Sequence, residues 1–122
     1  MLKIYEYKNC GTCKKALKFL DAKKIPYQKF PIREQPPTEA EIRKMLGHVG
    51  DIKKLFNTSG LDYKALKIKD KLSKMSTEQV FHLLAKNGNL IKRPFVMAAQ
   101  DGWVGFKEEE WGKKATFLEK RR

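Results

Sequence analysis

The chain has 122 residues and a formal net charge of +13, with 41% apolar and 34% charged residues. This length suits one domain with its own core, and the apolar content excludes a disordered chain. No apolar run approaches the roughly 20 residues that a membrane-spanning helix needs.

Charged residues at Lys3, Glu6 and Lys8 interrupt the first apolar stretch, so we expect no secretion signal and no membrane contact. We therefore predict that the protein is cytoplasmic. The lysines are spread from Lys3 to Lys120 and do not form one basic block. This distribution argues against direct sequence-specific DNA binding and favours solvated helix faces.

The first third of the chain predicts a βαβ unit. Residues 2–7 alternate apolar and polar, as in a strand. The next apolar positions recur at helical spacing: Cys13, Ala16, Leu17 and Leu20. Pro26 ends this helix, and residues 27–30 form a short extended segment that Pro31 closes. A right-handed crossover makes the two strands parallel and places Cys10 at the carboxyl end of the first strand, where such sheets carry their sites.

The middle of the chain, residues 35–88, predicts helices. Two capping boxes open longer helices: Thr38 with Glu41, and Ser76 with Gln79. Shorter helical turns are expected at 51–56 and 62–66, separated by a breaker at 57–60. Asn87 and Gly88 supply the stop for the last helix of this segment.

The last third predicts a hairpin and a closing helix. Residues 95–98 and 103–106 are extended, and Asp101-Gly102 forms the turn between them. Residues 108–118 follow as a helix, and 119–122 form a frayed basic end. Together these elements predict one α/β domain with a helical insertion.

The cysteine pair carries the clearest chemistry. A helix N-terminus offers unpaired N–H groups and about half a positive charge, which stabilises a thiolate at Cys10. Lys8, Lys14 and Lys15 add positive potential. Cys10 is therefore expected to attack, and Cys13, one turn further on and more inward, to resolve the product as the second thiol of a redox-active disulfide.

Two other roles for the thiols are a zinc site and an inert pair in a helix. A zinc site needs two further ligands, but there is no second cysteine pair, and His48 and His82 lie in helical patterns without ligand spacing. We therefore predict no metal, and ordinary surface or packing roles for both histidines. Inert helix thiols remain an alternative, although the loop position among lysines argues against it.

Four segments together resemble the ArsC-like family of arsenate reductases and Spx/MgsR regulators. They are YKNCGTCKKALKFL, LFNTSGLDYKAL, LIKRPF and GFKEEEW, in the family's order and over nearly the full length. The resemblance is strongest to the CxxC-containing Spx/MgsR branch. It implies a single domain over residues 1–122, in which 1–34 and 89–122 form a thioredoxin-like core and 35–88 a helical insertion.

The resemblance also implies that Arg93-Pro94 lies across from the cysteine loop. A cis proline there presents backbone to an extended partner, and Arg93 stabilises a thiolate or binds an oxyanion. Alternatively, Pro94 only starts an edge strand. Arsenate reductases surround one nucleophilic cysteine with three arginines, whereas here only Arg93 is kept and Asn57 and Lys107 occupy the other two positions. The resemblance thus implies that these three residues support an oxyanion or a thiolate, without the bidentate geometry of three arginines. This difference argues against arsenate reduction.

In the Spx branch a CxxC switch controls binding to the C-terminal domain of the RNA polymerase α subunit. Cys10 to Cys13 and Lys92-Arg93-Pro94 fit that pattern, Gly50 corresponds to a partner-contacting glycine, and the insertion becomes the docking surface. We therefore favour a redox-sensing transcriptional regulator without a bound cofactor. The alternative is a reductase with glutathione or thioredoxin as electron donor, so enzymatic activity stays open.

Overall fold

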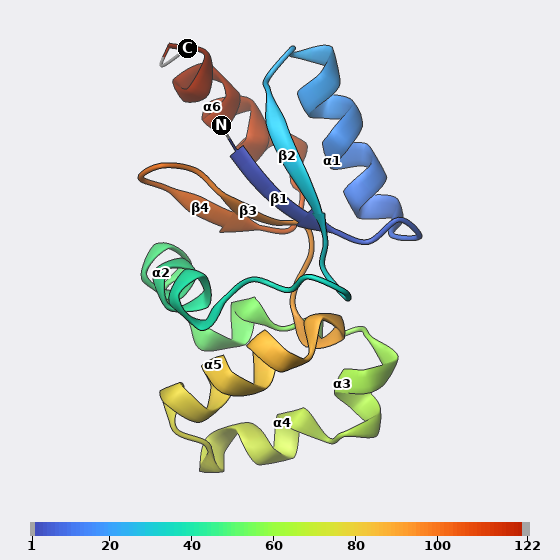
Figure 1. Ribbon diagram of the computed structural model, residues 1–122, viewed down its shortest axis with the longest axis vertical. Coiled ribbons are helices and arrows are strands. Elements are labelled where there is room, and N and C mark those ends of the chain that lie inside the picture. The colour runs from blue at the N-terminus through green and yellow to red at the C-terminus, as the bar shows by residue number, and fades with distance from the viewer. Residues whose placement is uncertain (1, 121–122) are drawn as a thin grey trace.

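A four-stranded mixed sheet with the order β2-β1-β3-β4 organises the chain (Figure 1). The computed structural model describes residues 2–120, with side chains as far as Ala115. The strands are β1 (Leu2–Glu6), β2 (Tyr27–Pro31), β3 (Phe95–Met97) and β4 (Gly102–Val104). β1 pairs with β2 in parallel, and β3 is antiparallel to both β1 and β4. This topology confirms the predicted βαβ unit and hairpin.

Helices cover both faces of the sheet. The α-helices are α1 (Gly11–Ala22), α2 (Glu39–Val49), α3 (Leu61–Ala65), α4 (Ile68–Lys71), α5 (Thr77–Lys86) and α6 (Glu108–Lys120). Short 3-10 helices are η1 (Ile52–Leu55), η2 (Leu72–Lys74) and η3 (Gly88–Leu90). Figure 1 shows α1 and α6 on one side of the sheet and the helices from α2 to α5 on the other.

Strand alternation explains this two-sided arrangement. Ile4 of β1 and Trp103 of β4 belong to a cluster that includes Trp111 of α6. Tyr5, the next residue along β1, and Phe95, which pairs with Tyr5 from β3, belong to the other cluster, beneath the helices from α2 to α5. Because successive strand residues point to opposite faces, one sheet supports two cores, one beneath α1 and α6 and one beneath the helices from α2 to α5.

The two longer helices of the middle segment, α2 and α5, begin at the predicted capping boxes. The Glu41 N–H donates to Thr38 Oγ1 at 3.1 Å, and the Thr38 N–H donates to Glu41 Oε1 at 3.0 Å. The equivalent box between Ser76 and Gln79 is also present. Both predicted capping boxes are therefore confirmed.

Several boundaries differ from the prediction. The first strand ends at Glu6, and α1 ends at Ala22, before Pro26. β2 includes Pro31, which fits because this strand lies at the sheet edge. At the other end, α6 continues to Lys120, so the frayed end predicted for 119–122 is wrong for its first two residues, and 121–122 lie outside the described residues.

The hairpin turn also differs. It spans residues 98–101, where the Ala98 N–H donates to the Asp101 carbonyl at 2.9 Å. Gly102 already pairs with Met97 in the sheet, and its N–H donates to Asp101 Oδ1 at 2.8 Å. Asp101 therefore ends the turn and caps the next strand.

α5 ends at Lys86 with Asn87 as its C-cap, which confirms the predicted helix stop, and Gly88 has a further role. It opens η3, and a Cβ on it would lie 1.9 Å from the Ile32 carbonyl oxygen. Only glycine allows the backbone of the insertion to approach the segment after β2 this closely. The residue therefore joins the insertion to the sheet.

Candidate functional site

The cysteine loop connects β1 to α1. Cys10 is the N-cap of α1 in an extended conformation, and its Sγ accepts the Cys13 N–H at 3.3 Å. The Cys10 N–H donates to the Tyr7 carbonyl at 3.0 Å, which closes the loop. The sulfur of Cys10 therefore faces the unpaired amides of a twelve-residue helix, an environment that stabilises negative charge on sulfur.

The two thiols are reduced and unequally exposed. Cys10 is half-buried and lines a pocket, whereas Cys13 is completely buried beneath the first turn of α1. Burial, assisted by a hydrogen bond with the Cys10 side chain, raises the pKa of Cys13 to about 12. Cys13 is thus a protonated thiol at neutral pH, and of the pair Cys10 alone is accessible to a partner.

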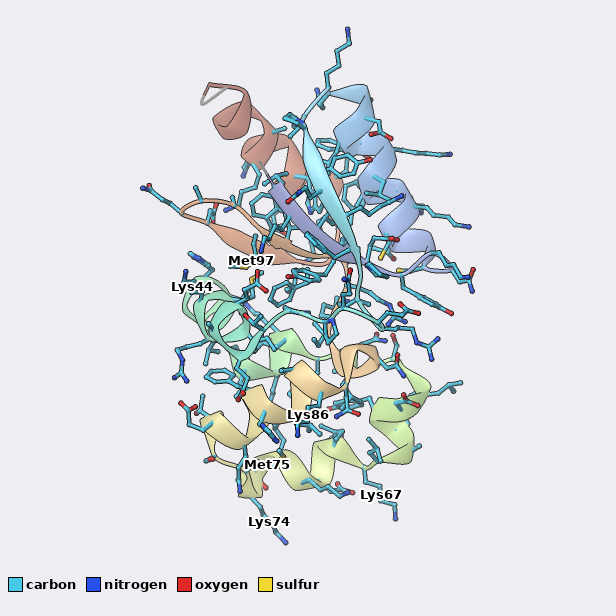
Figure 2. All side chains as sticks on the ribbon, in the orientation of Figure 1. Lys44, Lys67, Lys74, Met75, Lys86 and Met97 are labelled. Atoms are coloured by element: carbon cyan, nitrogen blue, oxygen red, sulfur yellow. The ribbon has the colours of Figure 1, made fainter. Side chains whose placement is uncertain are left out.

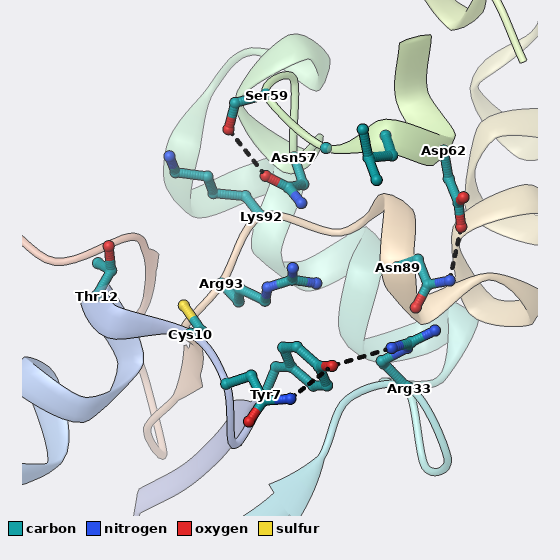
Figure 3. A pocket seen from close by; sticks show the side chains of 13 residues that line it. Tyr7, Cys10, Thr12, Arg33, Asn57, Ser59, Asp62, Asn89, Lys92 and Arg93 are labelled. Atoms are coloured by element: carbon teal, nitrogen blue, oxygen red, sulfur yellow. Dashed lines mark hydrogen bonds between the residues drawn. The ribbon is translucent and has the colours of Figure 1, made fainter. Parts of the chain in front are cut away.

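The pocket at Cys10 has a volume of about 450 Å³ and a basic lining (Figure 3). Three cationic side chains, Arg33, Lys92 and Arg93, line it together with the amide of Asn57. Asp62 is the one carboxylate among the described lining residues, and it accepts a hydrogen bond from Asn89 at 2.6 Å. The cavity next to the thiol therefore suits an anionic group.

Tyr7 connects the two guanidinium groups of this pocket. Its ring lies 5.0 Å from Cζ of Arg93 and 5.1 Å from Cζ of Arg33. Its hydroxyl accepts hydrogen bonds from Asn9 at 3.1 Å and from Arg33 at 3.2 Å, and these bonds lower the pKa of Tyr7 (Figure 3). The tyrosine thereby holds both guanidinium groups near the Cys10 loop.

Sequence reasoning missed Tyr7 and Arg33. A signal for Arg33 was present, because it lies two residues after the end of β2 and β2 runs parallel to β1. The carboxyl ends of parallel neighbours meet at one edge of a sheet, so a polar residue after β2 is expected near the Cys10 loop.

The structure brings together only part of the predicted site. Cys10, Asn57 and Arg93 line the same pocket, and Cys13 lies beneath it. Lys107 lines a different cavity, of about 490 Å³, along β4 and α6. The two cavities share Lys92. Lys107 is therefore not among the groups that line the thiol pocket.

Pro94 is buried, whereas Gly50 is exposed. The Arg93–Pro94 bond is cis, and Pro94 immediately precedes β3, which lies between β1 and β4. The alternative that Pro94 starts an edge strand is therefore wrong. Gly50 ends α2 with φ +80°, is exposed, and has no atom within 4 Å of where a Cβ would lie.

Two further features concern the described residues as a whole. Among them, no group of three or more histidine, cysteine or acidic side chains is arranged to hold a metal ion. None of their helices has the length and apolar character needed to cross a membrane.

Comparisons with known proteins place the chain in a family. The model of the ArsC family matches residues 5–114. An uncharacterized protein of Bacillus subtilis, YusI, is 42% identical over 90% of this chain and 94% of its own length. The global transcriptional regulator Spx of Listeria innocua is 28% identical over 90% of this chain and 83% of its own.

A solved structure shares the fold. The structure of a possible arsenate reductase from Streptococcus mutans UA159 superposes with a TM-score of 0.84 at 39% identity, covering 92% of this chain and 98% of that one. The predicted α/β fold with a thioredoxin-like core is thereby confirmed.

Proposed function

The chain belongs to the ArsC family, and on that premise we propose that it is a thiol–disulfide exchange protein in which Cys10 attacks and Cys13 resolves. The observation that carries the proposal is the unequal pair at the start of α1. Cys10 Sγ caps the helix and lines a cationic pocket, while Cys13 lies buried and protonated one turn away. Exchange requires these two roles: an accessible thiol that attacks the partner, and a second thiol that resolves the mixed disulfide.

The proposed exchange has two steps. The Cys10 thiolate attacks one sulfur of a partner disulfide, forming a mixed disulfide and releasing the other partner sulfur as a thiolate. Cys13 then loses its proton to that thiolate or to solvent and attacks Cys10 Sγ, which forms the Cys10–Cys13 disulfide and releases the second partner thiol. Two electrons pass from the chain to the partner, and a thiol reductant such as glutathione or thioredoxin restores the dithiol.

Single-cysteine variants test this assignment. In oxidised glutathione, Cys13→Ser is expected to accumulate one stable glutathione adduct at Cys10, because the resolving thiol is missing. Cys10→Ser is expected to remain unmodified, and the wild type to end as an intramolecular disulfide. Intact-mass spectrometry distinguishes the three species. An adduct at Cys13 in Cys10→Ser that forms as fast as the one at Cys10 would reverse the assigned roles.

We further propose that the thiol state controls binding to the C-terminal domain of the RNA polymerase α subunit. The resemblance to Spx regulators supports this role, and so does the exposed end of α2 at Gly50, which leaves space for a partner. A disulfide would form within the first turn of α1, where the Cys13 N–H donates to Cys10 Sγ, so oxidation acts directly on the start of this helix. The expected consequence is a difference in affinity between the dithiol and the disulfide.

A binding experiment with the purified α domain tests the regulatory role. We expect different affinities for the reduced and oxidised wild type, and loss of binding in Gly50→Arg. Because φ +80° strains most side chains at this position, Gly50→Asn is the matched control, since asparagine tolerates the left-handed conformation better than other residues with a side chain. If Gly50→Arg fails to bind because of the size of its side chain, Gly50→Asn should still bind the α domain. Absence of binding in both thiol states would exclude the polymerase partner and leave the exchange chemistry intact.

The second candidate, a reductase acting on a small oxyanion, is favoured by one observation. Arg33 gives the Cys10 pocket a second guanidinium beside Arg93, although the sequence pattern had retained only one. Turnover of arsenate with glutathione or thioredoxin as donor tests it. Arsenite formation that requires Cys10 supports a reductase. If arsenate is not turned over although the Cys10–Cys13 disulfide forms normally, the result supports the regulator.

A further inference from the structure

A larger pocket lies in the helical half of the molecule, apart from the two cysteines. It measures about 930 Å³ and lies between η1, α3 and the segment formed by α4 and η2. No residue of the thiol pocket lines it. The volume falls within the range of about 300–1,000 Å³ that small-molecule sites occupy.

The floor of this pocket is apolar and held in place by the core. Ile52, Tyr63 and Leu72 line it, are half-buried, and pack against the larger hydrophobic cluster. The Tyr63 ring also contacts Phe56, with ring centroids 5.8 Å apart. Because close-packed neighbours fix one side of these residues, the side that faces the pocket is a preformed apolar surface.

The rim of the pocket is positively charged. Four exposed lysines line it: Lys53, Lys64, Lys67 and Lys69. Of the described lining residues, Asp70 alone carries a carboxylate. None of the four lysines forms an ion pair with a carboxylate of residues 2–115. Their aliphatic stems can extend the apolar wall while their ammonium groups stay in water.

One rim lysine occupies a strained backbone position. Lys67 joins α3 to α4 with φ +53° and ψ +44°, a left-handed conformation that glycine adopts without strain. Figure 2 shows its side chain projecting from this junction, on the opposite side of the molecule from Lys44. The chain therefore carries a cation on the rim where the backbone alone favours glycine.

We propose that this pocket binds an amphipathic anion, a molecule with one alkyl chain and a carboxylate or phosphate head. The apolar floor disfavours a fully polar anion, which would leave that surface in water. The unpaired lysines repel a cationic amphiphile, and they can offer a neutral head group hydrogen bonds but no charge attraction. A free fatty acid and the exposed chain of an anionic lipid share this chemistry.

Titration of the full chain with decanoate, below its micellar concentration, tests the proposal. In ¹H–¹⁵N spectra we expect shifts at Ile52, Tyr63 and Leu72 and none at Cys10. From hexanoate to decanoate, each added methylene should tighten Kd by up to about fourfold. Decanol and decyltrimethylammonium should bind at least about tenfold more weakly than decanoate. An affinity independent of chain length or head group would overturn the proposal.

A second arm separates the two sources of the ligand. Cosedimentation with phosphatidylglycerol vesicles, but not with phosphatidylcholine vesicles, would identify a lipid source, whereas binding of decanoate alone would identify a free acid. Binding to neither overturns the proposal.

Charge variants locate the site. Lys64→Glu with Lys67→Glu should weaken decanoate binding at least about tenfold, while the matched pair Lys44→Glu with Lys86→Glu, outside the pocket, should change it less than twofold. Lys67→Gly relieves the left-handed strain, so it should weaken binding without lowering Tm. Equal losses in both double variants would show nonspecific attraction to a basic protein and refute the site.

Discussion

The buried position of Cys13 predicts a large difference in reactivity between its folded and unfolded states. With a pKa of about 12, about one Cys13 in 30,000 is a thiolate at pH 7.5, against about one in ten for a free cysteine. Since only the thiolate is alkylated, folding should slow the reaction of Cys13 about 3,000-fold, before its complete burial adds steric exclusion.

The assay uses Cys10→Ser, in which Cys13 is the remaining thiol, with iodoacetamide and mass spectrometry. The rate in buffer is compared with the rate of the same variant in urea, and Cys13→Ser reports Cys10 in parallel. The serine hydroxyl keeps a hydrogen-bond partner for Cys13, and the substitution leaves burial, the largest cause of the raised pKa, unchanged.

The pH dependence gives an independent check. Below pH 12 the thiolate fraction of Cys13 grows tenfold per pH unit, so its alkylation rate in the folded variant should rise tenfold per unit from pH 7 to pH 10. A folded rate within tenfold of the unfolded rate, or a plateau near pH 9, would refute the argument that Cys13 is a protonated resolving thiol.

Three further predictions concern stability and anion recognition. The unfolded chain releases the Cys13 proton from about pH 8.5 and the folded chain near pH 12. Stability is therefore fully present below about pH 8.5, and above it the wild type should lose up to about 1.4 kcal/mol per pH unit relative to Cys13→Ala in urea titrations. Gly88→Ala should cost about 3 kcal/mol or more, because its Cβ would overlap a carbonyl oxygen, whereas Gly47→Ala, exposed within α2, should gain up to about 1 kcal/mol. Equal midpoints would contradict the close approach. Arg33→Ala should slow the attack of Cys10 on the dianionic reagent dithiobis(nitrobenzoate) about three- to tenfold and leave the reaction with neutral dipyridyl disulfide unchanged. The control is Arg43→Ala: Arg43 pairs with Glu78 outside the pocket, so this variant should change neither rate. Equal slowing with both reagents would show that Arg33 has a structural role.

Local patterns predicted the elements that have local causes. The capping boxes at Thr38 and Ser76 opened helices because each is satisfied by a residue three positions on. The segment from α4 to η2 was not predicted, because helices of four and three residues are too short for periodicity to register. Its left-handed junction at Lys67 also carries no glycine or asparagine signal.

The site was predictable to the extent that it is local in sequence. Cys10 and Cys13 share one turn of helix, so their spacing revealed them. The contacts of Arg33 with Tyr7 join residues 26 positions apart, and no periodicity encodes such a pair. Conversely, the family resemblance matched Lys107 to one of the oxyanion arginines, but the fold places it in the cavity along β4.

The presence of Arg33 in the Cys10 pocket changes which experiment distinguishes a reductase from a regulator. Loss of two family arginines argued against a reductase only if no other guanidinium reached Cys10, and Arg33 does line its pocket. One of its five N–H donors goes to Tyr7, so most of its capacity remains for an anion. A thiol switch needs only the two cysteines, whereas oxyanion reduction also needs these cations. Arg33→Ala with intact disulfide formation should therefore abolish turnover in a reductase but preserve redox-dependent partner binding in a regulator.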